Sequence, residues 1–168
     1  MKIADVTSPN QPTLFVPIGP SGSGKTTLYR RMKAKNIDMD CFSLDNLRME
    51  WYNPDDYNDA WMKASKDKGF TNKANKRFIE MLKDGKDLCV DGTNLSPKKR
   101  RFFIEEAKKH NYKTVALVFN VDAETLESRR TSRDDKHVPA NSVKDQIRAM
   151  VPPQRGEFDD VKDVDNLE

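Results

Sequence analysis

Residues 13–26 read TLFVPIGPSGSGKT, and this stretch decides the fold. The apolar run at 13–18 is typical of a buried strand. The next eight residues, Gly19–Thr26, match the phosphate-binding loop pattern G-x-x-x-x-G-K-[ST] without a mismatch, and a helical pattern follows over 26–32. In this context the glycines let backbone N–H groups converge on phosphate oxygens, and the helix N-terminus adds positive potential. The stretch therefore predicts a nucleotide-binding site rather than a chance glycine-rich turn.

The loop also indicates a nucleoside triphosphate with its metal ion. Lys25 is expected to reach the β- and γ-phosphates, and the Thr26 hydroxyl is expected to bind Mg²⁺. ATP and Mg²⁺ are therefore the predicted cofactors. The candidate nucleotide-binding residues in this part of the chain are Gly19, Ser21, Gly22, Ser23, Gly24, Lys25, Thr26 and Thr27.

The composition fits one polar, soluble domain. The chain has 168 residues, of which 36% are hydrophobic and 34% charged, and its apolar residues cluster into segments. We expect a single domain over 1–168, with 1–12 as a short N-terminal extension. No apolar run approaches the roughly 18 residues that span a membrane, and residues 1–11 lack the apolar core of a signal peptide, so a cytoplasmic protein is expected. The net charge of +3 permits a polyanionic partner without requiring one.

Strand and helix patterns alternate along the chain, which predicts an α/β fold whose central sheet is mostly parallel and has about five strands flanked by helices. Cys41 and Cys89 fall inside expected strands and are interpreted as buried, reduced thiols. The expected strands cover 14–18, 40–44, 88–90, 114–119 and, as an edge strand, part of 158–164. The expected helices cover about 74–85, 97–110, 123–130 and 140–150.

A carboxylate follows the second expected strand, where ligands of open parallel sheets bind. Asp45 should point into the same crevice as the phosphate loop, where it could accept the proton of a hydroxyl that attacks the γ-phosphate. Arg48 would share a helical face with Asp45 and could hold a substrate phosphate. The alternative is that Asp45 only caps the next helix. Beside a phosphate loop, catalysis is favoured.

The third expected strand also ends in polar residues. Asp91 after an apolar run resembles a Walker B strand end, where a carboxylate orients Mg²⁺ through water. The segment that follows, Gly92–Asn94, can present Thr93 and Asn94 to a substrate. The alternative is an ordinary turn in which Asp91 or Asn94 caps locally.

Two basic stretches have both a functional and a structural interpretation. The basic stretch from Arg129 to Arg133, with Lys136 and His137 after it, connects the end of one expected helix to the next and could close over the triphosphate as a lid. The run Lys98–Arg101 could contact a polyanion. Charged runs of this kind are more often solvated helix faces.

Taken together, these pieces resemble the 5′-kinase domain of the bacteriophage polynucleotide kinase family, within the zeta-toxin/AAA_33-like group of P-loop kinases. The resemblance covers roughly residues 13–150. It is carried by the phosphate loop, by Asp-x-x-Arg at 45–48, by Thr-Asn-Leu-x-Pro at 93–97, and by an arginine-bearing segment at 129–133 followed by Val-Pro at 138–139.

The resemblance implies a role for each matching residue and an ATP-dependent transfer to a nucleic acid hydroxyl, most simply a 5′-OH end. Lys25 and Thr26 would bind the phosphates and magnesium, and Asp45 would be the general base. Arg48 would position an acceptor phosphate. Arg133 would act on the transferring phosphate, with Arg129 as its helper or as an adenine-side contact. A phage-encoded enzyme of this kind would work in the host cytoplasm.

This sequence departs from the family pattern in two places. Gly92 stands where one form of the family has Asp directly before Thr-Asn, which puts an acceptor-binding role of Asp91 in question. At 168 residues, the sequence is also expected to be too short to include the phosphatase domain of bifunctional phage members. Related phage kinases act on a hydroxymethyl group of modified pyrimidines within DNA, and the sequence is compatible with that acceptor too.

Two other functions are compatible with a phosphate loop. A small-molecule kinase of the shikimate or gluconate type would share the loop and the acid, although the chain has no Gly-Gly-Gly acceptor loop of the shikimate type. A non-catalytic nucleotide switch is the other possibility. A GTPase would need Asn-Lys-x-Asp, and the nearest run, residues 72–75, reads NKAN within a helical pattern.

Overall fold

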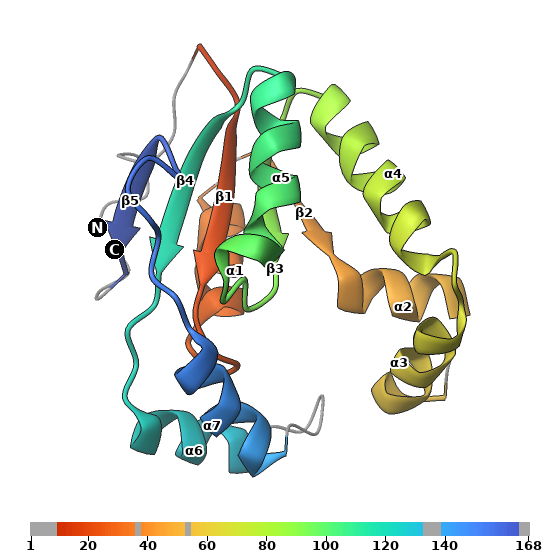
Figure 1. Ribbon diagram of the computed structural model, residues 1–168, viewed down its shortest axis with the longest axis vertical. Coiled ribbons are helices and arrows are strands. Elements are labelled where there is room, and N and C mark those ends of the chain that lie inside the picture. The colour runs from red at the N-terminus through yellow and green to blue at the C-terminus, as the bar shows by residue number, and fades with distance from the viewer. Residues whose placement is uncertain (1–9, 36–37, 53–54, 133–138, 165–168) are drawn as a thin grey trace.

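A computed structural model describes residues 10–35, 38–52, 55–132 and 139–164. In this part of the chain, five strands form one sheet in the order β2-β3-β1-β4-β5, and every neighbouring pair is parallel (Figure 1). The strands are β1 (Thr13–Ile18), β2 (Met39–Ser43), β3 (Asp87–Asp91), β4 (Lys113–Val118) and β5 (Asp160–Asp163). The α/β fold and the parallel sheet predicted from the sequence are confirmed.

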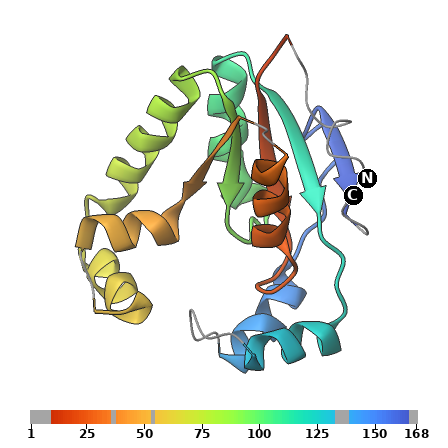
Figure 2. The ribbon, with the colours of Figure 1, turned by 180° about the vertical axis from the view of Figure 1, so that it is seen from behind.

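Helices cover both faces of the sheet. Helix α1 packs on one face, and α4 and α5 pack on the other, as the two opposite views show (Figures 1 and 2). Helices α2 and α3 extend from the end of β2, and α6 and α7 lie beyond the carboxyl ends of the strands (Figure 1). The bounds are α1 (Lys25–Ala34), α2 (Leu44–Tyr52), α3 (Tyr57–Lys66), α4 (Phe70–Lys83), α5 (Pro97–Lys109), α6 (Ala123–Thr131) and α7 (Ala140–Ala149).

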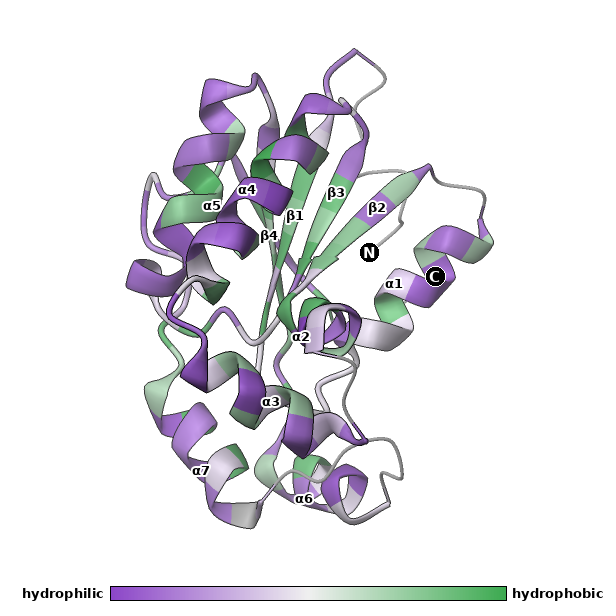
Figure 3. Ribbon diagram, turned by 90° about the vertical axis from the view of Figure 1, so that its right-hand side faces the viewer, coloured by the Kyte–Doolittle hydropathy of each residue, from purple (hydrophilic) through white to green (hydrophobic). Residues whose placement is uncertain are grey.

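The core follows from the two-residue period of the strands. In β1, Leu14, Val16 and Ile18 belong to the hydrophobic cluster under α4 and α5, whereas Phe15 belongs to the cluster under α1. Strands buried on both faces in this way read as continuous apolar runs, which explains why β1 and β4 stand out in the sequence. Figure 3 shows hydrophobic residues concentrated in the central strands and many hydrophilic residues along the helices around them. No helix in the described parts of the chain is long and apolar enough to cross a lipid bilayer.

Several helix ends lie where the sequence predicts them. The Ser96 side chain accepts a hydrogen bond from the N–H of Lys99 at the start of α5, with Pro97 in the first turn. Gly85 follows α4 with a φ of 73°, a left-handed conformation that glycine adopts without strain. Helix α3 is not among the helices predicted above. Its signals are Asp56, whose carboxylate caps the helix at Asp59 N–H, and the buried alanines at one-turn spacing, Ala60 and Ala64.

Candidate active site

One large cleft, about 2330 Å³ in volume, opens at the carboxyl edge of the sheet. Its described lining comes from the phosphate loop, from the ends of β2 and β3, from α2 to α4 on one side and from α6 and α7 on the other. The site residues predicted from the sequence that line it are Ser21, Gly22, Ser23, Gly24, Lys25, Thr26, Thr27, Asp45, Arg48, Asp91, Thr93, Asn94 and Arg129. The fold therefore brings four separate segments of the sequence to one place: the phosphate loop, residues 45–48, residues 91–94 and Arg129. Arg133, with Lys136 and His137, falls outside the described residues.

The backbone of the phosphate loop depends on glycine at two positions. Gly22 and Gly24 have φ angles of 86° and 103°, in the left-handed region that other residues enter only with strain. Gly19 is needed for a different reason, because a Cβ atom there would lie 2.9 Å from the Cβ of Phe119. Helix α1 begins at Lys25 without a side-chain cap. Its first N–H groups are thus the kind of uncapped donors that bind phosphate at helix N-termini.

The loop is held from both sides by its own lysine and by the helices beyond the sheet. Lys25 Nζ donates to the carbonyl oxygens of Gly19 and Pro20, at 2.8 and 2.7 Å. The Ser21 N–H donates to Gln146 Oε1 on α7 at 2.8 Å, and Arg129 Nη1 on α6 donates to the Gly22 carbonyl at 2.6 Å. Helices α6 and α7 therefore contact the phosphate loop directly, on the side where the sequence predicts an arginine-bearing lid.

The site fits a magnesium nucleotide. Mg²⁺ in kinase sites is usually bound by one or two protein groups, together with substrate phosphates and waters. Thr26 is exposed at the first turn of α1, and Asp91 lies at the end of β3 within the same cleft. Ser43 on the neighbouring strand donates to Asp91 Oδ2 at 3.1 Å, which orients this carboxylate.

Asp45 lies in the first turn of α2, on the opposite wall of the cleft from the phosphate loop. Its Oδ1 accepts hydrogen bonds from Arg48 Nη1 at 2.8 Å and from the Tyr57 hydroxyl at 3.0 Å. The helix-capping contact is made by Ser43 instead, whose Oγ accepts the N–H of Asn46 at 3.2 Å. Asp45 therefore has side-chain partners, one of them beyond the end of its own helix, and its role as a general base stays a prediction. Asp45 is a partly exposed carboxylate that two donors hold in place.

The surroundings of Asp45 belong to a small arm made of α2, α3 and the start of α4. The Arg48 guanidinium lies 5.3 Å from the centre of the Phe70 ring, so it is held between a carboxylate and an aromatic face. Tyr57 is the first residue of α3, and its position depends on the Asp56 cap. Because α3 is missing from the predicted elements, sequence reasoning also missed Tyr57 as a partner of Asp45. The Asp56-x-x-Asp59 pattern before buried alanines was the signal that could have found it.

The segment after β3 ties the sheet to the phosphate loop. The Thr93 carbonyl accepts the N–H of Gly19 at 3.1 Å, and Asn94 Nδ2 donates to the carbonyls of Pro17 and Val90 at 2.8 and 3.1 Å. Asn94 is 8% exposed and has a φ of 48°. These contacts give Thr93 and Asn94 a positioning role for the loop. Gly92 has a φ of 150°, which disfavours any residue with a side chain at the position where one family form has Asp.

Arg100 corrects the prediction made for the basic run Lys98–Arg101. Its side chain is fully buried, so it is neither a solvated charge nor a polyanion contact. Its five N–H donors are all used: Nε and Nη2 bind the Glu157 carboxylate at 2.9 and 2.8 Å, and the rest bind carbonyl oxygens. The carbonyls are those of Asn94, Val151 and Pro152. The sequence pattern at 98–101 hides this residue, because only the helix register distinguishes it from its neighbours.

Two more predictions can be placed. The run at 72–75 lies inside α4, so it cannot form the guanine-binding loop of a GTPase.

Cys41 and Cys89 are free thiols paired in register on β2 and β3. Cys89 is buried as expected, but Cys41 is only partly buried. A hydrogen bond with Cys41, together with burial, raises the pKa of the Cys89 thiol well above its ordinary value. Cys89 is therefore unreactive as a thiolate near neutral pH.

A parallel α/β sheet, a glycine-rich phosphate loop, and a fixed carboxylate across the same cleft define the class of P-loop kinases. The family model described as AAA domain (AAA_33) matches residues 14–153, and the chain belongs to this family. This confirms the P-loop kinase group to which the sequence motifs pointed.

Two groups of similar proteins bear on the acceptor. A protein of Autographa californica nuclear polyhedrosis virus, described as a bifunctional polynucleotide kinase/RNA ligase, is 28% identical over 136 residues, which is 76% of this chain and 19% of the viral protein. The structure of the Pnkp1/Rnl/Hen1 RNA repair complex contains a chain that matches with a TM-score of 0.65 at 19% identity, over 83% of this chain and 44% of that one. The present chain therefore spans about a fifth of its viral relative and under half of the repair-complex chain.

The second group consists of small-molecule kinases. Shikimate kinase from Bacteroides thetaiotaomicron matches with a TM-score of 0.62 at 19% identity, over 93% of this chain and 89% of the other. A gluconokinase from Sinorhizobium meliloti 1021 matches with a TM-score of 0.55 at 21% identity, over 92% of this chain and 84% of the other. At these identities the likeness establishes the kinase fold alone.

Proposed function

We propose that this chain is an ATP-dependent kinase that transfers the γ-phosphate to a hydroxyl of a nucleic acid, most simply the 5′-OH end of DNA or RNA. The observation that carries the proposal is the position of Asp45. It lies in the same cleft as the phosphate loop and is held by Arg48 and Tyr57 on a separate wall. A carboxylate so placed can serve an acceptor hydroxyl bound between the two walls.

The proposed step is a single in-line displacement. The acceptor oxygen forms a bond to the γ-phosphorus of ATP while the bond between that phosphorus and the β–γ bridging oxygen breaks, and ADP leaves. The proton of the acceptor hydroxyl passes to the Asp45 carboxylate. A positioned general base of this kind contributes typically 10²–10⁴-fold to a rate.

Basic side chains of this chain would bind both the phosphates of the nucleotide and a phosphate of the acceptor. Lys25 and the N–H groups of residues 21–26 would hold the nucleotide phosphates, and Arg129 already contacts the loop through Gly22. Thr26 and Asp91 would hold Mg²⁺, which when bound neutralises phosphate charge. Arg48 would hold an acceptor phosphate. The lid role of Arg133 remains a prediction from the sequence.

The nucleic acid acceptor is supported by two facts. The viral relative described as a polynucleotide kinase/RNA ligase aligns with 76% of this chain. In addition, basic side chains outnumber acidic ones by six to four among the described residues that line the cleft (Lys25, Arg30, Arg31, Arg48, Lys99 and Arg129 against Asp40, Asp45, Asp56 and Asp91). A polyanion is favoured by such a surface. The small-molecule kinases share the fold, and their acceptors therefore belong in the test as competitors.

The test offers [γ-³²P]ATP and Mg²⁺ with four kinds of acceptor in parallel. These are 5′-OH oligonucleotides of DNA and of RNA, duplex DNA containing hydroxymethyl pyrimidines, and small alcohols such as gluconate and shikimate. We expect label on the 5′-OH oligonucleotides and no label on the same strands when they already carry a 5′-phosphate. Label only on internal hydroxymethyl bases, or only on a small alcohol, would replace the proposed acceptor by that one.

A further inference from the structure

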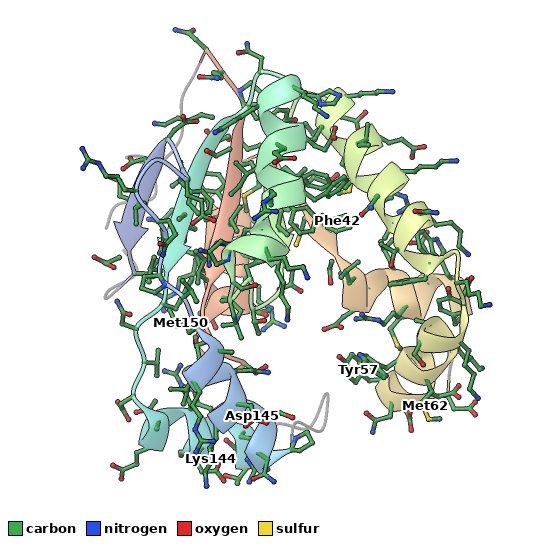
Figure 4. All side chains as sticks on the ribbon, viewed as in Figure 1. Phe42, Tyr57, Met62, Lys144, Asp145 and Met150 are labelled. Carbon is green, nitrogen blue, oxygen red and sulfur yellow. The ribbon has the colours of Figure 1, made fainter. Side chains whose placement is uncertain are left out.

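Helix α3 presents two aromatic side chains to the cleft. Tyr57 and Trp61 are four residues apart and therefore lie on the same side of the helix, and both belong to the cleft lining. Trp61 is 49% exposed. Met62, the next residue, is 56% exposed but does not line the cleft. Figure 4 shows Tyr57 on the side of α3 that faces across to α6 and α7, with Met62 on another side of the helix.

This aromatic face lies beside the candidate base. The Tyr57 hydroxyl is 3.0 Å from Asp45 Oδ1, and Trp61 lies four residues after Tyr57, about 6 Å further along the helix axis. That separation is comparable to the distance between the 5′-oxygen and the base of one nucleotide. A nucleotide whose 5′-hydroxyl faces Asp45 can therefore bring its base to Trp61.

The two tryptophans of the chain differ in a way that points to a ligand. Trp51 packs against the Phe70 ring with centroids 5.8 Å apart, and Lys73 and Arg77 lie over its face. No aromatic ring of the described residues packs against Trp61. Trp51 thus has a structural role. Trp61 leaves a large flat apolar surface in a cleft where, among the described lining residues, basic side chains outnumber acidic ones by six to four, which suits a ligand that is both flat and anionic.

We propose that Trp61, with Tyr57 beside it, is a stacking platform for the nucleobase at the 5′ end of the acceptor strand. The inference rests on the proposed function and narrows it to acceptors that carry a base next to the reacting hydroxyl. Stacking on an aromatic side chain tolerates any base, because each base has a π-face. The platform therefore predicts weak dependence on the terminal base but strong dependence on the presence of one. A small polyol has nothing to stack.

The experiment combines a protein change with a substrate change. Trp61→Ala is compared with Met62→Ala, a matched control because Met62 is exposed on the same helix but outside the cleft. Each protein is given a 5′-OH oligonucleotide and the same strand with an abasic 5′-terminal nucleotide that keeps its 5′-OH. We expect Trp61→Ala to raise KM for the intact strand roughly five- to 100-fold, the range of one lost base stack. KM for ATP and the behaviour of Met62→Ala should not change.

The abasic strand separates stacking from a general loss of structure. If Trp61 stacks on the terminal base, Trp61→Ala costs almost nothing with the abasic strand, because the partner is already missing. An equal loss with both strands would overturn the proposal, as would full activity of Trp61→Ala on the intact strand. In either of those cases the wild type still phosphorylates the intact strand, so the proposed function stands without the platform.

Binding gives an answer that does not depend on transfer. The intact 5′-OH oligonucleotide should quench the tryptophan fluorescence of the wild type, and Trp61→Phe, which keeps Trp51, should lose most of that quenching. Quenching without transfer would support the platform and refute the kinase activity toward 5′ ends. Quenching that is unchanged in Trp61→Phe would overturn the platform. So would self-association of the free protein that covers Trp61 before any oligonucleotide is added.

Discussion

The two walls of the cleft are built in different ways. One wall, the phosphate wall, is formed mainly by backbone groups. These are the N–H groups of the loop, two glycines in left-handed conformation and the uncapped start of α1. The opposite wall, which we call the acceptor wall, is formed by side chains from three helices: Asp45 and Arg48 of α2, Tyr57 of α3 and Phe70 of α4. A site made of backbone groups is encoded by one short, contiguous stretch of sequence. A side-chain site is assembled from residues that only the folded arm brings together.

This difference sets what each wall can do. A loop of main-chain donors recognises phosphate in any nucleotide, and the same loop serves kinases with unrelated acceptors. The exposed side chains of the arm can change without disturbing the sheet, whereas its buried ones, such as Leu47 and Phe70, belong to the same core cluster as β1. We therefore expect the arm to decide the acceptor, and a change on one wall should leave binding to the other wall intact.

The largest expected effect breaks the phosphate wall. Lys25→Ala removes the one loop side chain that can reach the β- and γ-phosphates, and we expect the rate of phosphoryl transfer to fall by about 10³-fold or more. ATP binding should weaken as well, because the lysine charge is lost from the nucleotide side. Initial rates and calorimetric titration with ATP measure the two effects. Lys98→Ala, which removes an exposed lysine outside the cleft, is the matched control.

The second prediction concerns a substitution that alters the acceptor wall and leaves the phosphate wall intact. Asp45→Asn keeps the size of the side chain but cannot accept the proton, so we expect kcat to fall by about 10²-fold or more. ATP affinity should stay within error of the wild type. The measurement is kcat beside a separate ATP titration, with Glu50→Gln, an exposed acid on the same helix, as control. Full turnover of Asp45→Asn would show that the carboxylate is not the base.

The phosphate wall could be predicted from the sequence better than the acceptor wall, because a contiguous motif forms the first and folding brings together the side chains of the second. Gly19–Thr26, its strand and its helix are local, and the apolar runs of β1 and β4 report burial on both faces, so the sheet could be predicted as well. Asp45 and Arg48 could be found because they follow a strand directly. Helix α3 has a local signal in its Asp56 cap, but the contact of Tyr57 with Asp45 depends on how α3 folds back against α2. No local pattern records that packing, so Tyr57 and Trp61 could not be placed at the site.

Arg100 and Asn94 show a second limit. Arg100 stands in a run of four basic residues, and its neighbour Lys99 is exposed, yet Arg100 itself is fully buried. Asn94 was a substrate-binding candidate, and its described bonds go to the backbone around the phosphate loop. Residue type predicted polarity in both cases. The direction of the side chain is set by tertiary contacts far away in the sequence, such as Glu157.

Glu157 gives the smallest of the three predictions and concerns the support of the phosphate wall alone. Among the described residues, Arg100 joins Glu157 to the Asn94 carbonyl, and the Thr93 carbonyl holds Gly19 of the loop. Burial alone would raise the pKa of the Glu157 carboxyl, but hydrogen bonds from Arg100 and from the Gln154 N–H hold the pKa below its ordinary value of 4.5. A carboxyl with a lowered pKa stabilises the fold above that value and loses this contribution as the pH falls through its folded pKa.

Glu157→Gln should therefore lower the free energy of unfolding at pH 7 by about 1–3 kcal/mol, because the buried guanidinium keeps hydrogen bonds but loses its counter-charge. The difference between wild type and variant should shrink as the pH is lowered below 4.5, the ordinary value for the carboxyl, because protonation of Glu157 then removes the same charge from the wild type. Urea unfolding at a series of pH values measures this, with Glu105→Gln, an exposed acid on α5, as control. A difference that stayed constant into acid would mean that the charge of Glu157 does not stabilise this part of the fold. If the two walls are separate, the variant at neutral pH should alter KM for ATP before it alters KM for the acceptor, since the bonds described here link Glu157 to the phosphate loop.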